Sequence, residues 1–291
     1  MSWGFVGLGQ MGLPMALNLS RVAECIAFDR KGIVPSGALE TVDDLSGLAQ
    51  CEQVILCLPN GSAVEDVLFG TGALADQLAK GTLIVDTSTT SHGTAVRVGE
   101  LLQARGLSFL DAPISGMQKR AEDGALTMMV GGDAGLLNRH EEVLGAMASK
   151  ILHVGPVGAG QLAKLINQLL FDINMAALAE ILPVSTKLGL DPDQVAEIVN
   201  SGTGRSYASE FFLPNILQGV FDQGYPMQAA YKDLIAGAEV TSTNGFPAPV
   251  LAAATATYQL ALAEGYGDSD KGAMIRVFER LVGAEFRTKR G

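Results

Sequence analysis

The sequence has little of what a disulfide-stapled or metal-dependent protein needs. Its 291 residues include only three cysteines and three histidines. Cys25, Cys51 and Cys57 have apolar neighbours and lack metal-ligand spacing, and the histidines form no ligand pattern with each other or with carboxylates. We therefore expect reduced thiols in a cytoplasmic protein, with no bound metal.

The sequence is also short of positive charge and of long apolar runs. Its 20 lysines and arginines stand against 31 aspartates and glutamates, which gives a net charge of −11 without any basic block. This balance argues against nucleic acid or an anionic membrane as the main partner. We find no basic leader followed by an apolar segment and no apolar run of about 20 residues, so we expect neither secretion nor a membrane span.

What the sequence does have is a hydrophobic content of 48%, enough for a large core and for two domains. Short apolar runs alternate with helical patterns through the first half, at 3–8, 25–29, 53–59, 82–88, 107–115 and 125–132. This alternation is typical of a parallel, doubly wound α/β sheet.

The second half has a different character. No further strand-like run bounded by turns appears, and helical periodicity takes over, so we expect an all-helical C-terminal domain. A long helix at 160–182 is expected to join two domains, 1–158 and 159–291, and Pro183 should kink or end this helix. Pro192 should then lie in the first turn of the next helix.

The stretch GAGQLAKLINQLL (158–170) places polar residues in an otherwise apolar helix. Residues three and four apart share a helix face, so Lys164, Asn167 and Gln168 form one narrow polar patch. Too few charges follow for a solvated face, and we expect a mostly buried helix whose polar stripe belongs to a functional site. The alternative is a lysine whose stem is buried while its ammonium group reaches water.

A glycine-rich loop follows the first expected strand. The residues GLGQMG fit the pattern G-x-G-x-x-G where a helix should begin, and a second strand ends further on at Asp29. The glycines allow a tight turn, a close approach of the backbone to a pyrophosphate, and close packing of helix on strand. We expect a dinucleotide to be bound here by Gly7, Leu8, Gly9, Gln10, Met11 and Gly12.

The residues after the second strand bear on the choice of cofactor. Asp29 would hydrogen-bond the adenine ribose hydroxyls and favours NAD, whereas Arg30 could neutralise the 2′-phosphate of NADP or simply be a solvated loop residue. Leu58–Pro59 and Thr87–Thr89 follow two further strands at the carboxyl edge of the sheet, where such folds bind ligands. These residues could contact the cofactor or serve only as turns and helix caps.

Together these features resemble the β-hydroxyacid dehydrogenase family, which includes 3-hydroxyisobutyrate dehydrogenase and tartronate semialdehyde reductase. The resemblance covers essentially the whole chain. Its motifs, in family order, are GFVGLGQMGLPMA (4–16), DAPISG (111–116), GAGQLAKLINQ (158–168) and KDL (232–234). It implies an N-terminal Rossmann domain followed by an all-helical domain.

The resemblance also implies roles for the matching residues around the substrate. Ser115 and Gly116 would hold the substrate carboxylate, and Lys164 would be the general acid/base. Asn167 and Gln168 would hold the rest of the substrate.

Around the cofactor, the resemblance implies that Thr89 lies beside the nicotinamide and that Lys232 reaches the cofactor. Members of the family form homodimers or homotetramers through the helical domain, and the apolar helices after Leu165 are compatible with this.

The sequence departs from the family pattern at a few positions. Many members have two asparagines where this chain has Asn167 and Gln168, a pair that looks like the tartronate semialdehyde reductase branch. The family usually has a glycine at the position of Met117, and Lys119 and Arg120 follow close by. These two cations are either part of a solvated loop or a sign that the substrate differs from the usual one, while the reaction type is unchanged.

The implied chemistry makes sense of the polar patch. Hydride transfer from carbon to nicotinamide requires a base for the hydroxyl proton, and loss of water between two domains would favour the neutral amine of Lys164. We expect an NAD(P)-dependent oxidoreductase that interconverts a small 3-hydroxy acid, similar to 3-hydroxyisobutyrate, and its semialdehyde. The alternatives are a tartronate semialdehyde, succinic semialdehyde or glyoxylate reductase of the same family, an imine reductase of similar architecture, or a non-catalytic dinucleotide-binding module.

Overall fold

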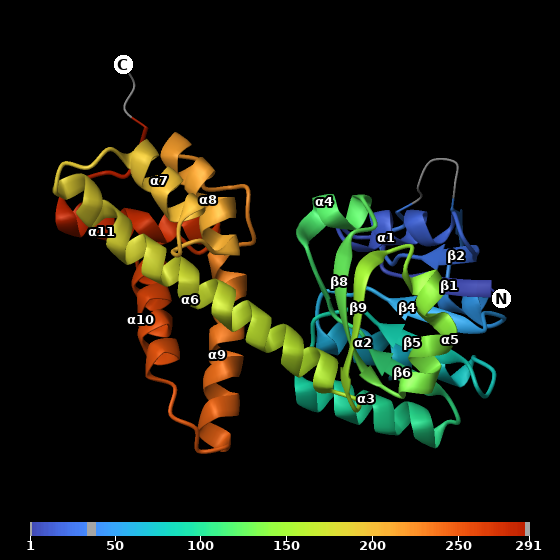
Figure 1. Ribbon diagram of the computed structural model, residues 1–291. Helices are drawn as coiled ribbons and strands as arrows, with labels where there is room; N and C mark the ends of the chain where they lie inside the picture. The colour runs from blue at the N-terminus through green and yellow to red at the C-terminus, as the bar shows by residue number, and fades with distance from the viewer. Residues whose placement is uncertain (1, 34–38, 289–291) are drawn as a thin grey trace. The chain divides into compact units, whose positions relative to one another are not determined.

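The computed structural model describes residues 2–33 and 39–288. The chain divides into two compact units, Met1–Lys164 and Leu165–Gly291, and each is described here by itself. Figure 1 shows a strand-containing first unit and a helical second unit. The expected Rossmann domain and all-helical domain are therefore both confirmed.

The first unit is built on one sheet. Its strands are β1 (Ser2–Val6), β2 (Glu24–Phe28), β3 (Glu40–Thr41), β4 (Gln53–Leu56), β5 (Leu83–Asp86), β6 (Ser108–Asp111), β7 (Ile114–Ser115), β8 (Leu126–Gly132) and β9 (Ala148–Gly155). The order is β3-β2-β1-β4-β5-β6-β8-β7, with β9 paired to β8, and the pairs from β3 to β6 are all parallel. This is the doubly wound order of a dinucleotide-binding domain.

Two features of the sheet differ from the expectation. The sheet is mixed, not purely parallel, because β8 runs antiparallel to both β6 and β7. The chain reverses direction between the end of β7 at Ser115 and the start of β8 at Leu126, and so β8 runs against both earlier strands. Strand β9 was not expected at all. Within the described residues it pairs with β8 alone, and most of its side chains are exposed or half-buried, unlike those of a central strand.

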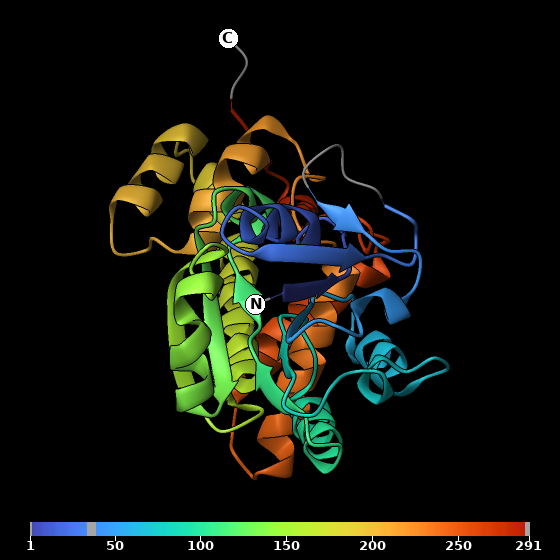
Figure 2. The same cartoon turned by 90° about the vertical axis from the view of Figure 1, so that its right-hand side faces the viewer.

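Helices cover both faces of the sheet (Figure 2). On β1, Trp3 and Phe5 join one apolar cluster while Val6 joins the other, because alternate side chains of a strand point to opposite faces. The helices are α1 (Gly12–Leu19), α4 (Met117–Glu122) and α5 (Ala134–Leu144) on the first cluster, and α2 (Gly61–Phe69) and α3 (His92–Ala104) on the second. The short 3-10 helices η1 (Leu45–Leu48) and η2 (Leu74–Asp76) pack on the second cluster as well.

The second unit is entirely helical in its described residues. It comprises α6 (Ala159–Lys187, which begins in the first unit), α7 (Pro192–Ser201), α8 (Tyr207–Gln218), α9 (Met227–Thr243), α10 (Pro249–Ala263), η3 (Lys271–Met274) and α11 (Ile275–Val282). A core with Phe212, Tyr258 and Phe286 fully buried holds these helices together. Pro192 occupies the first turn of α7 as expected, behind an Asp191 side chain that caps the helix.

Helix α6 corrects two expectations. Of the kink or end expected at Pro183, the end is wrong: the helix continues to Lys187, since a proline removes a single N–H from the ladder and the remaining turns can keep their bonds. It is also less buried in the single chain than its composition suggested, with Ile166 53%, Leu170 59% and Ile181 62% exposed. By length and composition alone α6 could cross a membrane, but long core helices of other proteins pass the same test.

Candidate active site

The glycine-rich loop has the shape that a pyrophosphate requires. Gly7 has a φ of 99°, and a Cβ added there would lie 2.3 Å from the carbonyl oxygen of Cys57. A Cβ on Gly12 would lie 1.9 Å from the carbonyl oxygen of Gly7, whereas at Gly9 nothing lies within 4 Å. Helix α1 begins at Gly12 without a side-chain cap, and the N–H of Leu13 in its first turn donates to the carbonyl oxygen of Gly9 at 3.0 Å, which holds the loop against the start of the helix. These residues fit a dinucleotide.

Asp29 follows β2 and is tied to this loop. Its Oδ2 accepts a hydrogen bond from the backbone N–H of Leu8 at 2.7 Å, and its Oδ1 accepts one from Lys31 N–H at 2.8 Å. Arg30 points to a different partner, because it forms an exposed ion pair with Asp66. Asp29 therefore lies at the end of β2 beside the glycine-rich loop, and Arg30 would have to leave Asp66 to meet a 2′-phosphate.

The loops after β4 and β5 are bonded to each other. Leu58 N–H donates to Ser88 Oγ at 2.9 Å, and Thr87 Oγ1 donates to the carbonyl oxygen of Leu56 at 2.7 Å. Pro59 and Thr89 are both exposed at this edge of the sheet. Thr87 and Ser88 therefore stabilise these turns through their hydrogen bonds, whereas Pro59 and Thr89 are accessible to a ligand.

Buried aspartates end the neighbouring strands β5 and β6. Asp86 is 1% exposed and Asp111 is 0% exposed. Burial raises the pKa of Asp86 to about 7, hydrogen bonds from Ser88 oppose this, and the charge of Asp111 adds to it. Burial also raises the pKa of Asp111, against hydrogen bonds from the backbone at Gly158 and Gln161.

Asp111 fastens the start of α6 to the sheet. Its Oδ1 accepts the N–H of Gly158 at 2.7 Å and its Oδ2 accepts the N–H of Gln161 at 3.0 Å. The Gln161 side chain then accepts the N–H of Thr90 at 2.9 Å and donates to the carbonyl oxygen of Ser88 at 2.8 Å. Sequence reasoning assigned no role to Asp111 or Gln161, although both lie inside the motifs DAPISG and GAGQLAKLINQ.

Ser115 and Gly116 lie just before α4. Ser115 ends β7, and Gly116 has a φ of 145°. Met117, the first residue of α4, has a φ of 60°, a conformation that few residues other than glycine adopt readily. A glycine, which the family resemblance led us to expect here, would adopt this conformation without strain, whereas Met117 is strained.

Lys164, Asn167 and Gln168 lie on successive turns of α6. Lys164 is 8% exposed, Gln168 is half-buried and Asn167 is exposed. Gln168 Nε2 donates to Asp233 Oδ2 at 3.3 Å, and Asp233 follows the exposed Lys232 on α9. The structure thus brings Gln168 to the KDL motif through Asp233, a residue that sequence reasoning did not single out.

Comparisons with known proteins agree with this geometry. Residues 2–155 match the NAD binding domain of 6-phosphogluconate dehydrogenase, and residues 158–278 match the NAD-binding domain of NADP-dependent 3-hydroxyisobutyrate dehydrogenase. The chain is 36% identical to 2-(hydroxymethyl)glutarate dehydrogenase of Eubacterium barkeri, over 96% of this chain and 95% of the relative. It is 32% identical to NAD-dependent L-serine dehydrogenase of Pseudomonas aeruginosa, over 96% of this chain and 98% of the relative.

A solved structure agrees as well. The structure of Mycobacterium tuberculosis 3-hydroxyisobutyrate dehydrogenase with L-serine matches with a TM-score of 0.84 at 31% identity, over 94% of this chain and 98% of that one. The chain belongs to the β-hydroxyacid dehydrogenase family. It is an NAD(P)-dependent 3-hydroxyacid dehydrogenase that acts on small hydroxy acids.

The dehydrogenase holds a buried ion pair in its second unit, one turn beyond Gln168. Lys271 on η3 is bonded to Asp172 on α6, and the two side chains are 1% and 0% exposed. Tyr258 donates to Asp172 Oδ1 at 3.3 Å, and the Lys271 ammonium lies 4.0 Å from the centre of the Phe171 ring. Burial raises the pKa of Asp172 to about 6 even though Lys271 lowers it, and Asp172 Oδ2 has no hydrogen-bond partner within the described part of the chain.

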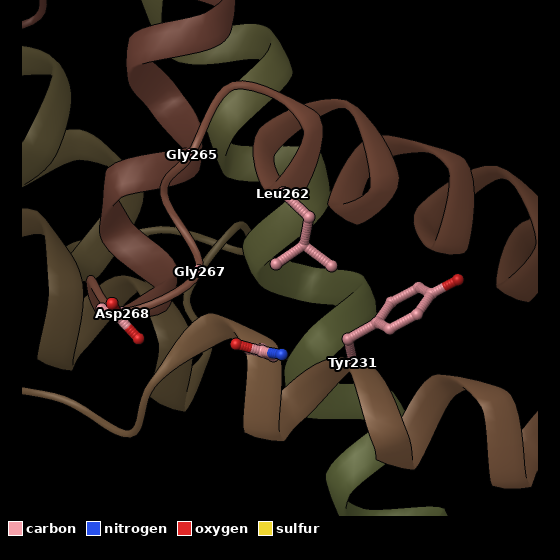
Figure 3. A pocket seen from close by; sticks show the side chains of 6 residues that line it. Tyr231, Leu262, Gly265, Gly267 and Asp268 are labelled. Carbon is pink, nitrogen blue, oxygen red and sulfur yellow. The ribbon is translucent and has the colours of Figure 1, made fainter.

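A hollow of about 450 Å³ also lies in the second unit of the dehydrogenase (Figure 3). It is lined by Gln228, Tyr231, Leu262, Gly265, Gly267 and Asp268. None of the motif residues lines it, so this hollow is not the site that the motifs mark. Over residues 2–33 and 39–288, no group of three or more histidine, cysteine, aspartate or glutamate side chains is arranged to hold a metal ion.

Proposed function

We propose that the enzyme interconverts a 3-hydroxy carboxylic acid of the 3-hydroxyisobutyrate type and its semialdehyde, with Lys164 as the general acid/base. The observation that carries the proposal is the placement of Lys164. It is 8% exposed, and it lies one turn after Gln161, which is bonded to the loop at the carboxyl edge of the sheet. In this proposal residues 1–158 bind the cofactor and residues 159–291 form the substrate and oligomerisation domain.

The relatives support this substrate class. The compounds 2-(hydroxymethyl)glutarate, L-serine and 3-hydroxyisobutyrate, which appear in the names of similar proteins, all have a hydroxymethyl group on the carbon next to the carboxylate. They differ only in the remaining substituent. The common unit HOCH2–CHR–COO⁻ is therefore the proposed substrate, and the substituent R is what this enzyme must distinguish.

The chain's own residues would hold this common unit. The Ser115 hydroxyl and the backbone N–H at Gly116 are donors suited to the carboxylate, and the amides of Asn167 and Gln168 are suited to the polar atoms near the hydroxyl. Asp233 restrains the Gln168 amide through its hydrogen bond, which limits the directions in which that amide can donate.

The reaction needs a hydride acceptor and a proton acceptor. Bound NAD(P)⁺ supplies the first, because its nicotinamide takes the hydride from the carbinol carbon. In its neutral form the Lys164 amine takes the hydroxyl proton as the carbonyl forms, and in reduction its ammonium returns that proton to the oxygen. Thr89 beside the nicotinamide, Leu58 and Pro59 on the adjoining loop, and Lys232 are the proposed contacts of the cofactor outside the glycine-rich loop.

The proposal is tested by the absorbance of NADH over a panel of acids. The purified enzyme is given NAD⁺ with 3-hydroxyisobutyrate, L-serine, L-threonate, glycerate and a 2-hydroxy acid without a hydroxymethyl group. We expect turnover of acids that contain HOCH2–CHR–COO⁻, and none of their methyl esters, because an ester leaves buried donors unpaired. Turnover of the 2-hydroxy acid alone, or equal turnover of acids and esters, would refute the proposal.

We also propose that the enzyme is a cytoplasmic homodimer or homotetramer assembled through its helical domain. In the single chain α6 exposes Ile166, Leu170 and Ile181, an apolar surface of the kind that a second copy covers. The described cysteines are all free thiols, as in a reducing compartment. Light scattering after size exclusion gives the mass in solution, and a monomer at micromolar concentration would contradict the assembly.

A further inference from the structure

The substrate loop leads directly into a helix that carries a cation. Ser115 and Gly116 are followed by α4, whose first residue, Met117, has a φ of 60°. This backbone conformation is strained for a residue other than glycine. Arg120 lies one helical turn after Met117 and packs back against the Ser115–Gly116 loop.

Helix α4 is held firmly against the cofactor helix α1. Gln10 Nε2, in the glycine-rich loop, donates to Gln118 Oε1 at 2.8 Å. At the other end, Asn18 Nδ2 donates to the carbonyl oxygens of Ala121 at 2.9 Å and Glu122 at 3.2 Å. The backbone of Arg120 is therefore fixed relative to both the cofactor loop and Ser115.

The stem of Arg120 lies on Gly116. A Cβ added to Gly116 would be 3.0 Å from the Cβ and 3.1 Å from the Cδ of Arg120, so only a glycine lets the two residues pack this closely. The Cδ is two bonds from the centre of the guanidinium group, which is thus carried at the rim of the Ser115–Gly116 loop. Arg120 is half-buried in this position.

Within the described residues the Arg120 guanidinium has no hydrogen-bond or ion-pair partner, whereas the charged side chains beside it do. Lys119 Nζ is paired with Asp123 Oδ1 at 2.9 Å, and Glu122 Oε1 accepts from Gln118 Nε2 at 3.0 Å. The carboxylates of Glu122, on this helix, and of Asp123, which caps its C-terminus, are thereby engaged by other side chains. Throughout residues 2–33 and 39–288, no hydrogen bond or ion pair forms to the Arg120 guanidinium. A half-buried guanidinium beside a carboxylate-binding loop is a bidentate receptor for one more anion.

We propose that Arg120 is a specificity-determining residue that binds a second carboxylate on the substrate, so that the preferred R group of HOCH2–CHR–COO⁻ ends in an anion. The inference rests on the proposed function, in which Ser115 and Gly116 hold the first carboxylate. The first carboxylate and the hydroxyl are common to all substrates of this type, and Arg120 selects among them by charge. Lys119 does not take part, because Asp123 neutralises it.

The test compares acids that differ only in the charge of R. Wild type, Arg120→Gln and the matched control Lys119→Gln are assayed with three acids, in which R is –CH2CH2COO⁻, –CH2CH2CONH2 or –CH3. We expect wild type to prefer the diacid over its amide by about tenfold to a hundredfold in kcat/KM, as for loss of a charged hydrogen bond. Arg120→Gln should abolish that preference, mainly through KM, and should leave the other two acids within about threefold of wild type. Lys119→Gln should change none of these ratios.

Two kinetic results would overturn the role of Arg120. One is a wild type without preference for the diacid. The other is an Arg120→Gln variant that loses activity equally on all three acids or has a raised KM for NAD⁺, which would assign the guanidinium to the fold or to the cofactor.

A binding measurement separates this inference from the proposed function. Glutarate, which has both carboxylates but no hydroxyl to oxidise, is titrated calorimetrically into the NAD⁺-loaded enzyme. Binding that is weakened at least tenfold in Arg120→Gln and unchanged in Lys119→Gln supports the receptor even if no hydroxy acid is turned over, in which case only the proposed function fails. Equal affinity of wild type and Arg120→Gln, together with turnover of monoacids, would refute the receptor and leave the proposed function standing.

Discussion

Asp86 and Asp111 lie opposite each other in the register of β5 and β6, so that two buried carboxylates end adjacent strands. Their environments differ in one respect. Among the described residues, the Asp111 carboxylate accepts the N–H groups of Gly158 and Gln161, whereas the Asp86 carboxylate accepts hydrogen bonds from Ser88 alone. The less well satisfied member, Asp86, has the pKa raised to about 7.

This pair predicts a stability that falls as the pH rises. The folded pKa of Asp86, about 7, lies above the value of about 3.9 for an unfolded aspartate, so the folded protein binds the extra proton. The resulting stabilisation is complete below about pH 4 and is lost as the pH rises through about 7. Asp86→Asn should therefore gain unfolding free energy relative to wild type between pH 5 and pH 8, by up to a few kcal/mol at about 1.4 kcal/mol per pKa unit. Urea unfolding of wild type and Asp86→Asn at pH 5 and pH 8 measures the difference in unfolding free energy. The exposed Asp76→Asn serves as the control variant. Parallel pH profiles of wild type and Asp86→Asn would refute the prediction.

Replacing Lys164 with alanine should lower kcat about a hundredfold or more, the usual scale for loss of a general acid/base. Binding of NADH, followed by its fluorescence, should be unchanged because the glycine-rich loop is untouched. Lys187→Ala, an exposed lysine near the end of the same helix, should behave as wild type. A Lys164→Ala enzyme that kept more than a third of the wild-type kcat would remove Lys164 from the mechanism.

The buried pair of Asp172 and Lys271 should couple strongly in stability. Lys271→Met leaves a buried carboxylate without its cation, and should destabilise the protein by about 3–5 kcal/mol. Adding Asp172→Leu should recover most of that loss, since an apolar pair of similar volume is often as stable as a buried ion pair. Urea unfolding of the two single variants and the double variant completes the cycle, and effects that simply add would show that the two residues do not interact energetically.

Changing Asp29 should shift the cofactor preference from NAD toward NADP. A carboxylate repels a 2′-phosphate, and Asp29→Asn removes that charge while keeping an oxygen for the N–H of Leu8. Asp66→Asn should add a several-fold gain with NADP by releasing Arg30 from its exposed ion pair. The measurement is kcat/KM for both cofactors. A wild type that already favours NADP would show that Arg30, not Asp29, sets the choice.

Met117 should tolerate glycine or asparagine better than valine. At a φ of 60° a β-branched side chain is strongly disfavoured, so Met117→Val should lose more than about 1 kcal/mol of unfolding free energy. Met117→Gly should be close to neutral, because relief of strain is offset by the greater freedom of glycine in the unfolded chain. Thermal unfolding of the three variants gives the order directly, and a valine variant as stable as wild type would contradict the strain.

The sequence was sufficient to predict those elements whose signal is local. The parallel strands β1, β2, β4 and β5 show continuous apolar runs, and the capped start of α7 follows from Asp191 and Pro192. Strand β9 has no such run, because an edge strand can be largely exposed, and it is defined only by its pairing with β8. The antiparallel direction of β8 likewise depends on how the chain turns between β7 and β8, which the local periodicity of the sequence does not show.

For the site, local motifs located the residues but not their partners. The loop Gly7–Gly12 and the polar stripe with Lys164 and Gln168 could be read from spacing. The bonds from Asp111 to Gly158 and from Asp172 to Lys271 join residues far apart in sequence, and only the folded chain reveals them. The exposure of the apolar side of α6 was missed for a similar reason, since composition does not say whether a second molecule or the same chain covers it.

Helix α6 begins in one compact unit and continues in the other, with Lys164 the last residue of the first unit and Leu165 the first residue of the second. A chimera of two relatives joined at this division would take Lys164, the proposed proton-transfer residue, from one parent and the amides of Asn167 and Gln168 from the other, within two turns of one helix. Reactivity and substrate preference are therefore not exchangeable modules at that point. A junction in the segment before α6 would transfer the whole polar stripe together, and it would need only a parent aspartate at position 111 to receive the incoming helix.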